Sequence, residues 1–279
     1  MAFLPAAASL LAGDPDQNAQ MSQQPFRLDG KIAFISAARG HLGRAMSQGL
    51  AAAGAHVIIN GRDDAALAGY ESELRDSGFS VERAAFDACD PERLKAFFAA
   101  RPRLDILVNN AVAMQVKPFA ALTAEDFAHT WRSSVVAAFE AARAALPALR
   151  AAVAAAGDAS IVNIASMYGL VAPQASLYAD PGQQSPFHYG PAKAGLIQLT
   201  RHLAAELGPQ RIRVNALAPG PFPAHVADPA FGARLAARTM LGRLGGAGEI
   251  AGPLLFLASP ASSFVTGAVL AVDGGWTAW

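Results

Sequence analysis

Residues 31–53 read KIAFISAARGHLGRAMSQGLAAA, and this stretch decides the fold. Residues 31–36 are a short apolar run of the kind that forms a buried strand, and the Ala- and Leu-rich end of the stretch has the pattern of an amphipathic helix. The turn between them contains Gly40 and Gly43. A strand, a small-residue turn and a helix together bring backbone N–H groups to a phosphate at the helix N-terminus. An ordinary strand-to-helix turn would share this pattern, so the rest of the chain has to decide.

Further apolar runs repeat this alternation of strand and helix. They cover residues 54–60, 79–86, 104–111, 160–166, 211–217 and 268–275. Short apolar runs that alternate with helical patterns are typical of a parallel sheet with right-handed crossovers. The sequence therefore predicts an α/β fold, namely a Rossmann-like, doubly wound parallel sheet of about seven strands with helices on both faces, in a single domain.

Prolines constrain two of the expected helices. Residues 123–156 have a helical pattern, and Pro147 should kink or divide it about one turn earlier. Another helix is expected to start at residues 185–186, where a serine and a proline resemble an N-cap and a first helical residue. Pro191 conflicts with that start, because its ring would meet the carbonyl group of Phe187. Either this helix begins later or its first turns are bent.

The composition excludes several classes of partner. Lys plus Arg and Asp plus Glu both number 22, so no excess charge points to nucleic acid, and we expect a small-molecule partner. No uninterrupted apolar run reaches the roughly 18 residues of a membrane span. The single cysteine, Cys89, cannot form an intrachain disulfide, which fits a reducing compartment. We therefore expect a soluble, cytoplasmic protein that does not bind a membrane.

The domain organisation is expected to be simple. Residues 1–26 combine an Ala-rich apolar piece with a polar piece, and we interpret them as a flexible N-terminal tail outside the fold. Residues 27–279 would form the domain. Within it, residues 221–248 contain few strand signals and are interpreted as a loop region over a substrate.

Three residues between positions 166 and 193 suggest proton-transfer chemistry. Ser166 closes the run 160–166, so its hydroxyl is expected at the C-terminal edge of the sheet, where open α/β sheets bind ligands. Tyr189 and Lys193 have the spacing that shares one face of a helix. A free tyrosine has a pKa of about 10, and an adjacent cation would lower that value. This spacing is common by itself, so it identifies a candidate acid only together with other motifs.

The end of the second expected strand bears on the choice of dinucleotide. In such folds an acidic residue here holds the adenosine ribose, whereas a basic residue accommodates a 2′-phosphate. The sequence Asn60-Gly61-Arg62 offers no carboxylate at the strand tip, although Asp63 follows. Charge complementarity therefore favours NADP over NAD, unless Arg62 faces solvent.

With these strand ends laid out, the sequence resembles the classical short-chain dehydrogenase/reductase family over about residues 26–279. The resemblance is carried by motifs in a fixed order: the turn 36–43, Asp87, Asn109-Asn110-Ala111, Ser166, Tyr189-x3-Lys193, Asn215, Pro219-Gly220 and Val272-Asp273-Gly274-Gly275. Family members are mostly tetramers built through the helices that correspond here to residues 123–156 and 188–208. The resemblance therefore implies a homotetramer.

The resemblance also implies a role for each matching residue. Tyr189 would exchange the proton on the substrate oxygen, Ser166 would hydrogen-bond that oxygen, and Lys193 would lower the pKa of the tyrosine and hold the nicotinamide ribose. Hydride would pass directly between substrate and nicotinamide, so no metal is needed. Ser134 completes the candidate catalytic set. The candidate cofactor-binding residues are Ser36, Arg39, His41, Leu42, Gly43, Arg62, Asp87, Ala88, Asn109, Ala111, Tyr189, Lys193, Pro219, Gly220 and Phe222.

Several positions depart from the family pattern. Ala37 and His41 stand where the family usually has glycines, so the turn over the pyrophosphate must differ. Val112 replaces a further glycine and would crowd the floor beneath the cofactor. Ser134 occupies the place of an Asn that completes a catalytic tetrad, and this shorter side chain would leave the proton relay to water.

The spacing between Ser166 and Tyr189 is about ten residues longer than is usual in the family. The extra residues, around 176–186, are expected to form a loop beside the substrate pocket. Tyr178 lies at the usual spacing, but Gly182 takes the place of the lysine, so Tyr178 is rejected as the acid.

Three functions compete at this point. The first is an NADP(H)-preferring oxidoreductase that interconverts a ketone and a secondary alcohol. The second is an NAD-dependent polyol or sugar-acid dehydrogenase, similar to gluconate dehydrogenases, in which Asn60 or Asp63 would hold the ribose. The third is a non-catalytic dinucleotide-binding scaffold or sensor, and the retained Ser166, Tyr189 and Lys193 argue against it. The fold itself carries no information on the substrate.

Overall fold

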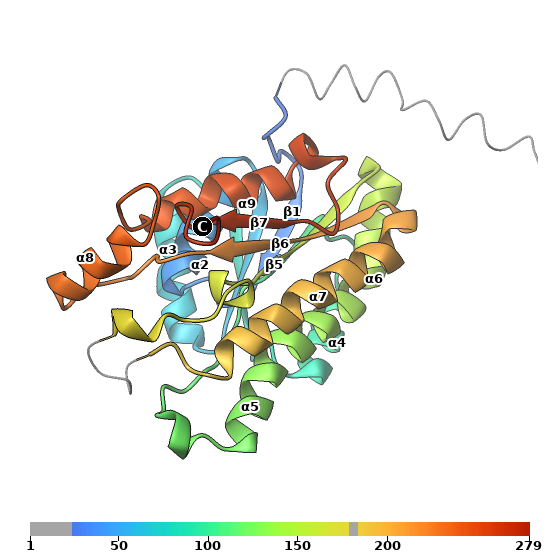
Figure 1. Cartoon of the computed structure of the whole chain (residues 1–279). Coiled ribbons are helices and arrows are strands. Elements are labelled where there is room, and N and C mark those ends of the chain that lie inside the picture. The colour runs from blue at the N-terminus through green and yellow to red at the C-terminus, as the bar shows by residue number, and fades with distance from the viewer. Residues whose placement is uncertain (1–23, 179–183) are drawn as a thin grey trace, which may run out of the picture.

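Seven parallel strands form one sheet in the computed structural model, which describes residues 24–178 and 184–279 (Figure 1). The strands are β1 (Ile32–Ile35), β2 (His56–Gly61), β3 (Val81–Ala85), β4 (Ile106–Asn109), β5 (Ala159–Ile164), β6 (Ile212–Pro219) and β7 (Val269–Val272). Their order is β3-β2-β1-β4-β5-β6-β7. The predicted doubly wound parallel sheet is thereby confirmed. Most of the expected N-terminal tail lies outside the described residues.

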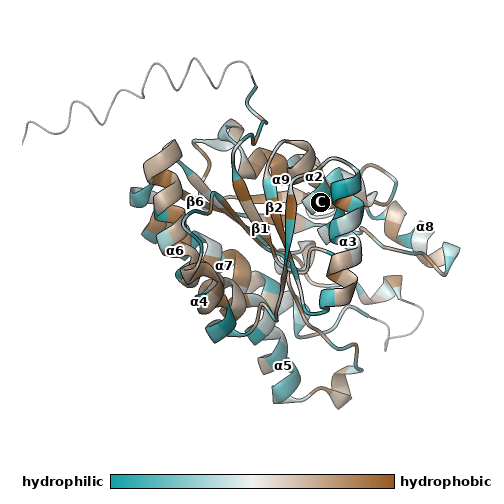
Figure 2. Ribbon diagram, turned by 180° about the vertical axis from the view of Figure 1, so that it is seen from behind, coloured by the Kyte–Doolittle hydropathy of each residue, from teal (hydrophilic) through white to brown (hydrophobic). Residues whose placement is uncertain are grey.

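Helices cover both faces of the sheet (Figure 1). On one face lie α2 (His41–Ala52), α3 (Asp64–Asp76) and α9 (Ala251–Ala258), and on the other lie α4 (Pro91–Ala99), α6 (Ala137–Ala156) and α7 (Tyr189–Leu207). Successive strand residues point to opposite faces, so Ile35 packs in the first layer and Phe34 in the second. The view from behind shows these apolar strands enclosed between the helices (Figure 2).

The switch in strand order lies between β1 and β4, which are hydrogen-bonded neighbours in the sheet. Chain connections leave these two strands in opposite directions, so their C-terminal ends open a crevice. The turn before α2 and the residues after β4 border this crevice. The fold therefore places the candidate dinucleotide site where open α/β sheets bind ligands.

The long helix expected at residues 123–156 is interrupted earlier than Pro147. It consists of α5 (Ala124–Trp131), a π-helical turn (Arg132–Val136) and α6. Pro147 lies inside α6, so the expected division at the proline is wrong. Pro147 has no N–H group to donate to the carbonyl oxygen of Arg143. Both residues are exposed, so water has access to this carbonyl oxygen. Buried alanines on the other side of α6 hold the helix against the sheet.

The helix that carries the candidate acid begins at Tyr189 and not at residues 185–186. Pro191 therefore lies in the first turn of α7, where its missing N–H would have no partner within the helix. His188 is the N-cap residue. The later start resolves the conflict between Pro191 and Phe187, and it places Tyr189 at the helix N-terminus.

Residues 221–248, called the cover below, follow β6 and include α8 (Pro229–Ala237). Their expected position over a substrate stays a prediction. Asp228 caps α8 by accepting a hydrogen bond from the Ala230 N–H group. Figure 1 shows α8 projecting beyond the C-terminal edge of the sheet. Among the residues that the structure describes, no helix is both long and apolar enough to cross a membrane.

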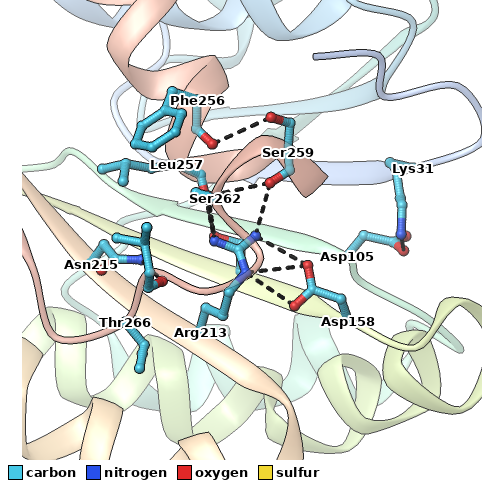
Figure 3. Close-up of polar contacts among 12 residues, drawn as sticks. Lys31, Asp105, Asp158, Arg213, Asn215, Phe256, Leu257, Ser259, Ser262 and Thr266 are labelled. Atoms are coloured by element: carbon cyan, nitrogen blue, oxygen red, sulfur yellow. Dashed lines mark hydrogen bonds and ion pairs between the residues drawn. The ribbon is translucent and has the colours of Figure 1, made fainter. Parts of the chain in front are cut away.

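A buried ionic network closes the opposite edge of the sheet (Figure 3). The guanidinium group of Arg213, in β6, is paired with the Asp158 carboxylate at 3.1 Å. It also donates to the carbonyl oxygens of Leu257 and Ser259 and to the Ser262 hydroxyl. These bonds tie the end of α9 to the amino ends of β5 and β6, far from the crevice.

Candidate active site

The three candidate catalytic residues meet at the C-terminal edge of β5. Ser166 follows the last residue of that strand, Ile164, where the chain leaves the sheet. Tyr189 is the first residue of α7, and Lys193 lies one turn later on the same face. The Ser166 hydroxyl is close enough to affect the Tyr189 phenol, and Lys193 reaches back to the end of β5.

Two glycines allow this close approach. A Cβ atom on Gly169 would lie 2.9 Å from the backbone carbonyl carbon of Lys193. A Cβ atom on Gly190 would lie 2.8 Å from the carbonyl oxygen of Tyr168. Both distances are too short for a side chain, so glycine is required where the segment after Ser166 crosses the start of α7.

The backbone fixes the orientation of Ser166. The serine is 6% exposed, and its Oγ accepts a 3.1 Å hydrogen bond from the Tyr168 N–H group. A hydroxyl that already accepts from the backbone keeps its own hydrogen for another acceptor. Ser166 is therefore prepared to donate towards a substrate oxygen.

Lys193 is buried deeply for a lysine. It is 2% exposed, and its Nζ donates a 2.7 Å hydrogen bond to the carbonyl oxygen of Ile164. Burial lowers the pKa of Lys193 to about 7, because the charged form loses its hydration.

Burial also dominates the pKa of Tyr189 and raises it, while the Ser166 hydroxyl acts in the opposite direction. The expected lowering of this pKa by Lys193 stays a prediction. Sequence spacing located the pair but could not reveal how deeply both groups are buried.

Ser134 lies in the π-helical turn and not beside Tyr189. It is 2% exposed, and its Oγ is buried without a hydrogen-bond partner among the described residues. It borders a cavity of about 10 Å³ that Ser36 and Asn109 also line. That volume is at the lower limit for one water molecule. The structure thus places Ser134 next to the ends of β1 and β4.

The turn before α2 has the geometry of an anion cradle. A Cβ atom on Gly43 would lie 2.3 Å from the carbonyl oxygen of Ala37, so only glycine fits there. Ala37 itself adopts a left-handed conformation with φ of 50°, which favours glycine. The Ser36 Oγ accepts from the N–H groups of Asn110 and Ala111, which joins the ends of β1 and β4.

His41 and Leu42 are the first residues of α2, and His41 is exposed. Their backbone N–H groups belong to the first turn, where helices leave donors without partners. A phosphate at this position would receive those donors together with the positive end of the helix dipole. The altered turn therefore keeps the elements that a pyrophosphate needs.

A cavity of about 450 Å³ extends from this turn along the ends of β2, β3 and β4. The sequence-predicted residues Arg39, Arg62, Asp87, Ala88 and Ala111 line it. Val112, which replaces a family glycine, stands 37% exposed at its wall. A glycine cradle beside two arginines fits the phosphates and the adenosine half of a dinucleotide.

The side chains at the tip of β2 bear on which ribose the cavity can hold. Asn60 is 1% exposed, and its amide donates to the carbonyl oxygens of Ala84 and Phe86. The Asp63 carboxylate caps α3 by accepting from the Ala66 N–H group at 3.0 Å. Arg62 is exposed at the cavity wall. Asn60 and Asp63 also line the cavity, and the Asn60 Oδ1 atom has no hydrogen-bond partner among the described residues.

Asp87 and Asn109 differ in what their side chains can reach. Asp87 is exposed after β3 and accepts a hydrogen bond from the Cys89 N–H group at 2.9 Å. Asn109 is 8% exposed, and its amide donates to the Asn163 side chain at 2.9 Å. Asn163 in turn donates to Thr200. Asn109 therefore supports the junction of β4, β5 and α7.

The remaining predicted cofactor residues follow β6. Pro219 ends that strand, and the Gly220 N–H donates to the Val272 carbonyl oxygen at 2.9 Å. A Cβ atom on Gly220 would lie 2.5 Å from the Asp273 Cα atom, so this crossing needs glycine. The Phe222 ring packs over Gly245, in the cover that contains α8.

Several residues that sequence reasoning missed lie around the site. His129 and Arg132, from α5 and the π-helical turn, line the 450 Å³ cavity. His188 is 1% exposed, and its Nε2 contacts the Gln115 carbonyl oxygen at 3.1 Å. No spacing rule could have identified these residues, because their positions depend on contacts between distant segments.

Comparisons with known proteins agree with this geometry. A family model described as enoyl-(acyl carrier protein) reductase matches residues 37–277. The galactitol 2-dehydrogenase (L-tagatose-forming) of Cereibacter sphaeroides is 37% identical over 263 residues, which cover 91% of this chain and 98% of the relative. The gluconate 5-dehydrogenase of Gluconobacter oxydans is 34% identical over 269 residues, or 90% of this chain and 96% of the relative.

A solved structure extends the comparison. The gluconate 5-dehydrogenase from Burkholderia cenocepacia J2315, in complex with NADP and tartrate, has a TM-score of 0.81 and 34% sequence identity. The alignment covers 92% of this chain and 99% of that structure. The chain belongs to the classical short-chain dehydrogenase/reductase family. It is an NAD(P)-dependent oxidoreductase that acts on alcohol or carbonyl groups.

Proposed function

We propose that the protein is an NADP(H)-preferring oxidoreductase that interconverts a ketone and a secondary alcohol, with Tyr189 as the acid/base. One observation carries this proposal: Ser166, Tyr189 and Lys193 meet at the C-terminal edge of β5, on the same edge of the sheet as the cavity that bears Arg62. Residues 27–279 would form the single catalytic domain.

Each side chain has a defined task in this mechanism. The bound nicotinamide cofactor supplies or accepts the hydride. Ser166 donates a hydrogen bond to the substrate oxygen, and Tyr189 gives that oxygen a proton in reduction and removes it in oxidation. Lys193 has a pKa of about 7, a value suited to passing a proton onward near neutral pH, and the Ile164 carbonyl oxygen holds it in place.

The first test replaces the candidate acid. Tyr189→Phe keeps the ring and removes the phenolic oxygen, so turnover with any ketone of a broad panel should disappear. Calorimetric binding of NADPH should stay within about twofold, because the ring remains in place. Substantial turnover by this variant would refute the mechanism.

The preference for NADP rests on the tip of β2. Arg62 is exposed at the cavity, whereas one oxygen of the Asp63 carboxylate already caps α3. Arg62→Ala should lower kcat/KM for NADPH by about tenfold and leave that for NADH nearly unchanged. Arg143→Ala, in α6, is the matched control. A preference of the wild type for NADH would refute the assignment.

A second candidate is an NAD-dependent polyol or sugar-acid dehydrogenase. It is favoured by the relatives named galactitol 2-dehydrogenase and gluconate 5-dehydrogenase. Assays of galactitol and gluconate with both NAD and NADP would separate it from the first candidate. The scaffold alternative gains no support, because these relatives are named as dehydrogenases.

We also infer a homotetramer in the cytoplasm. Four large apolar side chains between α5 and the start of α6 are between 37% and 45% exposed, namely Phe127, Trp131, Val136 and Phe139. A second copy would cover these apolar side chains. Light scattering at micromolar concentration should give four times the chain mass, and a monomer would contradict the inference.

A further inference from the structure

The lengthened segment between Ser166 and Tyr189 carries a pair of hydrogen-bonded phenols. The hydroxyl oxygens of Tyr168 and Tyr178 lie 2.9 Å apart. Tyr168 also donates its backbone N–H to the Ser166 Oγ, as described above. Its side chain is close enough to Tyr189 for the two phenols to affect each other electrostatically. Tyr168 therefore connects the pair to the candidate catalytic residues Ser166 and Tyr189.

The other end of the pair is held by α8. The rings of Tyr178 and Phe231 lie 5.4 Å apart. The neighbouring carbonyl oxygen of Leu177 accepts a 2.8 Å hydrogen bond from Arg234, also in α8. These contacts fix the phenol of Tyr178 between the catalytic edge of the sheet and the cover.

A cavity of about 560 Å³ lies beside this pair, and Tyr168 forms part of its wall. Gly190 and Ala194 of α7 form another part. On an α-helix these two positions lie about 100° around the axis from Tyr189 and Lys193. The cavity therefore flanks the catalytic face of α7, and Tyr168 contributes to its wall. A substrate that extends from the catalytic face into this cavity would contact Tyr168, which holds Tyr178 by its hydroxyl.

The chemistry of two neutral phenols defines what they recognise. Burial and the neighbouring Tyr178 raise the pKa of Tyr168, so it does not ionise near neutral pH. Two phenols hold two hydroxyl hydrogens, and their mutual bond uses one. One donor and further lone pairs remain for a group that both donates and accepts. An alcohol hydroxyl has this property, whereas a hydrocarbon does not.

We propose that the Tyr168–Tyr178 pair binds a second hydroxyl group of the substrate, next to the reacting carbon, and so selects diols and polyols over simple alcohols. This inference rests on the proposed function. It assigns Tyr178 a role in substrate specificity, which follows from its contacts and not from its spacing in the sequence.

The test compares two substrates that differ in one hydroxyl group, cyclohexane-1,2-diol and cyclohexanol. Tyr178→Phe retains the ring that packs on Phe231 and removes only the hydroxyl. It should lower kcat/KM for the diol about tenfold, the effect of one lost hydrogen bond, and change that for cyclohexanol less than about twofold. Tyr168→Phe should produce the same difference between the substrates.

Two further variants separate specificity from structure. Ser176 lies in the short helix Ala175–Leu177, which ends just before Tyr178. The variant Ser176→Ala should leave kcat/KM unchanged for both substrates. Phe231→Leu keeps both phenols but weakens their support, so it should raise KM for the diol more than it lowers kcat. Equal losses for both substrates in Tyr178→Phe would mean that the pair only stabilises the loop, and this result would overturn the proposal.

A binding measurement keeps the proposal testable if the wild type turns over neither substrate. The proposed function is then decided by the broad ketone panel, whereas the phenol pair is tested by titrating the diol into the NADP-loaded protein. The diol should bind about tenfold more weakly to Tyr178→Phe than to the wild type, because the variant loses one hydrogen bond to the diol. Equal affinity for both proteins would refute the phenol site independently of catalysis.

Discussion

The Nζ atom of Lys193 lies 5.6 Å from the centre of the Tyr189 ring, on the same face of α7. Tyr189 is half-buried and Lys193 is buried, and the loss of hydration raises the pKa of the phenol and lowers the pKa of the amine. Neither group is therefore stabilised in its charged form by the fold alone. Burial of the Lys193 amine therefore costs folding stability, and this cost can be measured.

Lys193→Met should make the protein more stable and inactive. The pKa of Lys193 falls from 10.5 to about 7 on folding, so the unfolded chain binds the proton more tightly. The lysine therefore destabilises the fold fully below pH 7, and less as the pH rises to 10.5. Urea unfolding should show a net gain of about 2 kcal/mol at pH 7 that shrinks towards pH 10, after the lost hydrogen bond to Ile164 is counted.

The control for this prediction is Lys95→Met, at an exposed position of α4. It should change the free energy of unfolding by less than about 0.5 kcal/mol at any of these pH values. A loss of stability in Lys193→Met at pH 7 would show that the hydrogen bond to Ile164 outweighs the burial of the amine.

Ser166→Ala should move the pH dependence of alcohol oxidation to higher pH. The Ser166 hydroxyl lowers the pKa of Tyr189, so its removal raises that pKa further. Oxidation needs the phenolate and should then rise with pH later than in the wild type. The turnover number should also fall by about 100-fold, because the substrate oxygen loses a donor. An unchanged pH profile would separate Ser166 from the titration of Tyr189.

Ala37→Gly should stabilise the turn before α2. Ala37 has a φ of 50°, a conformation that costs an L-residue about 1 to 2 kcal/mol. Glycine removes this strain but gains about 0.5 to 1 kcal/mol of unfolded-state entropy, so the net gain should be up to about 1 kcal/mol. Ala53→Gly, at a position with φ of −76°, is the control and should only destabilise. Thermal unfolding would measure both.

Asp158→Ala should destabilise the fold without a direct effect on catalysis. It would leave the guanidinium group of Arg213, 6% exposed, without its carboxylate partner. Asp158 is 34% exposed, so solvent screening reduces the expected loss to about 2 kcal/mol. Glu140→Ala breaks an exposed pair with Arg143 and should cost less than about 1 kcal/mol. The KM for the cofactor should stay constant in both variants.

The strand ends could be predicted because parallel strands all finish at one edge of a sheet. The motif around Ser166 and the spacing of Tyr189 and Lys193 then located the candidate proton-transfer site. The start of α7 was wrong by a few residues, although Pro191 had signalled the problem. Local propensity favoured a helix start at residues 185–186, but it could not show at which residue the helix begins in the fold.

Other features lay beyond sequence reasoning because they depend on burial and on distant contacts. The low pKa of Lys193 follows from the depth of its side chain, which its spacing from Tyr189 does not reveal. The bond between Tyr168 and Tyr178 depends on how the lengthened loop returns to the sheet. The capping role of Asp63 could have been predicted in part from the sequence, because an aspartate just before a helix is a common N-cap.

The two glycines at the crossing of this loop have an evolutionary consequence. Gly169 and Gly190 bring the two ends of the loop into contact, next to Ser166 and Tyr189. Because the ends are joined in this way, the chain between them can gain or lose residues without moving the chemical groups. Insertions and deletions at this point would let a lineage acquire new substrates while it inherits the same reaction.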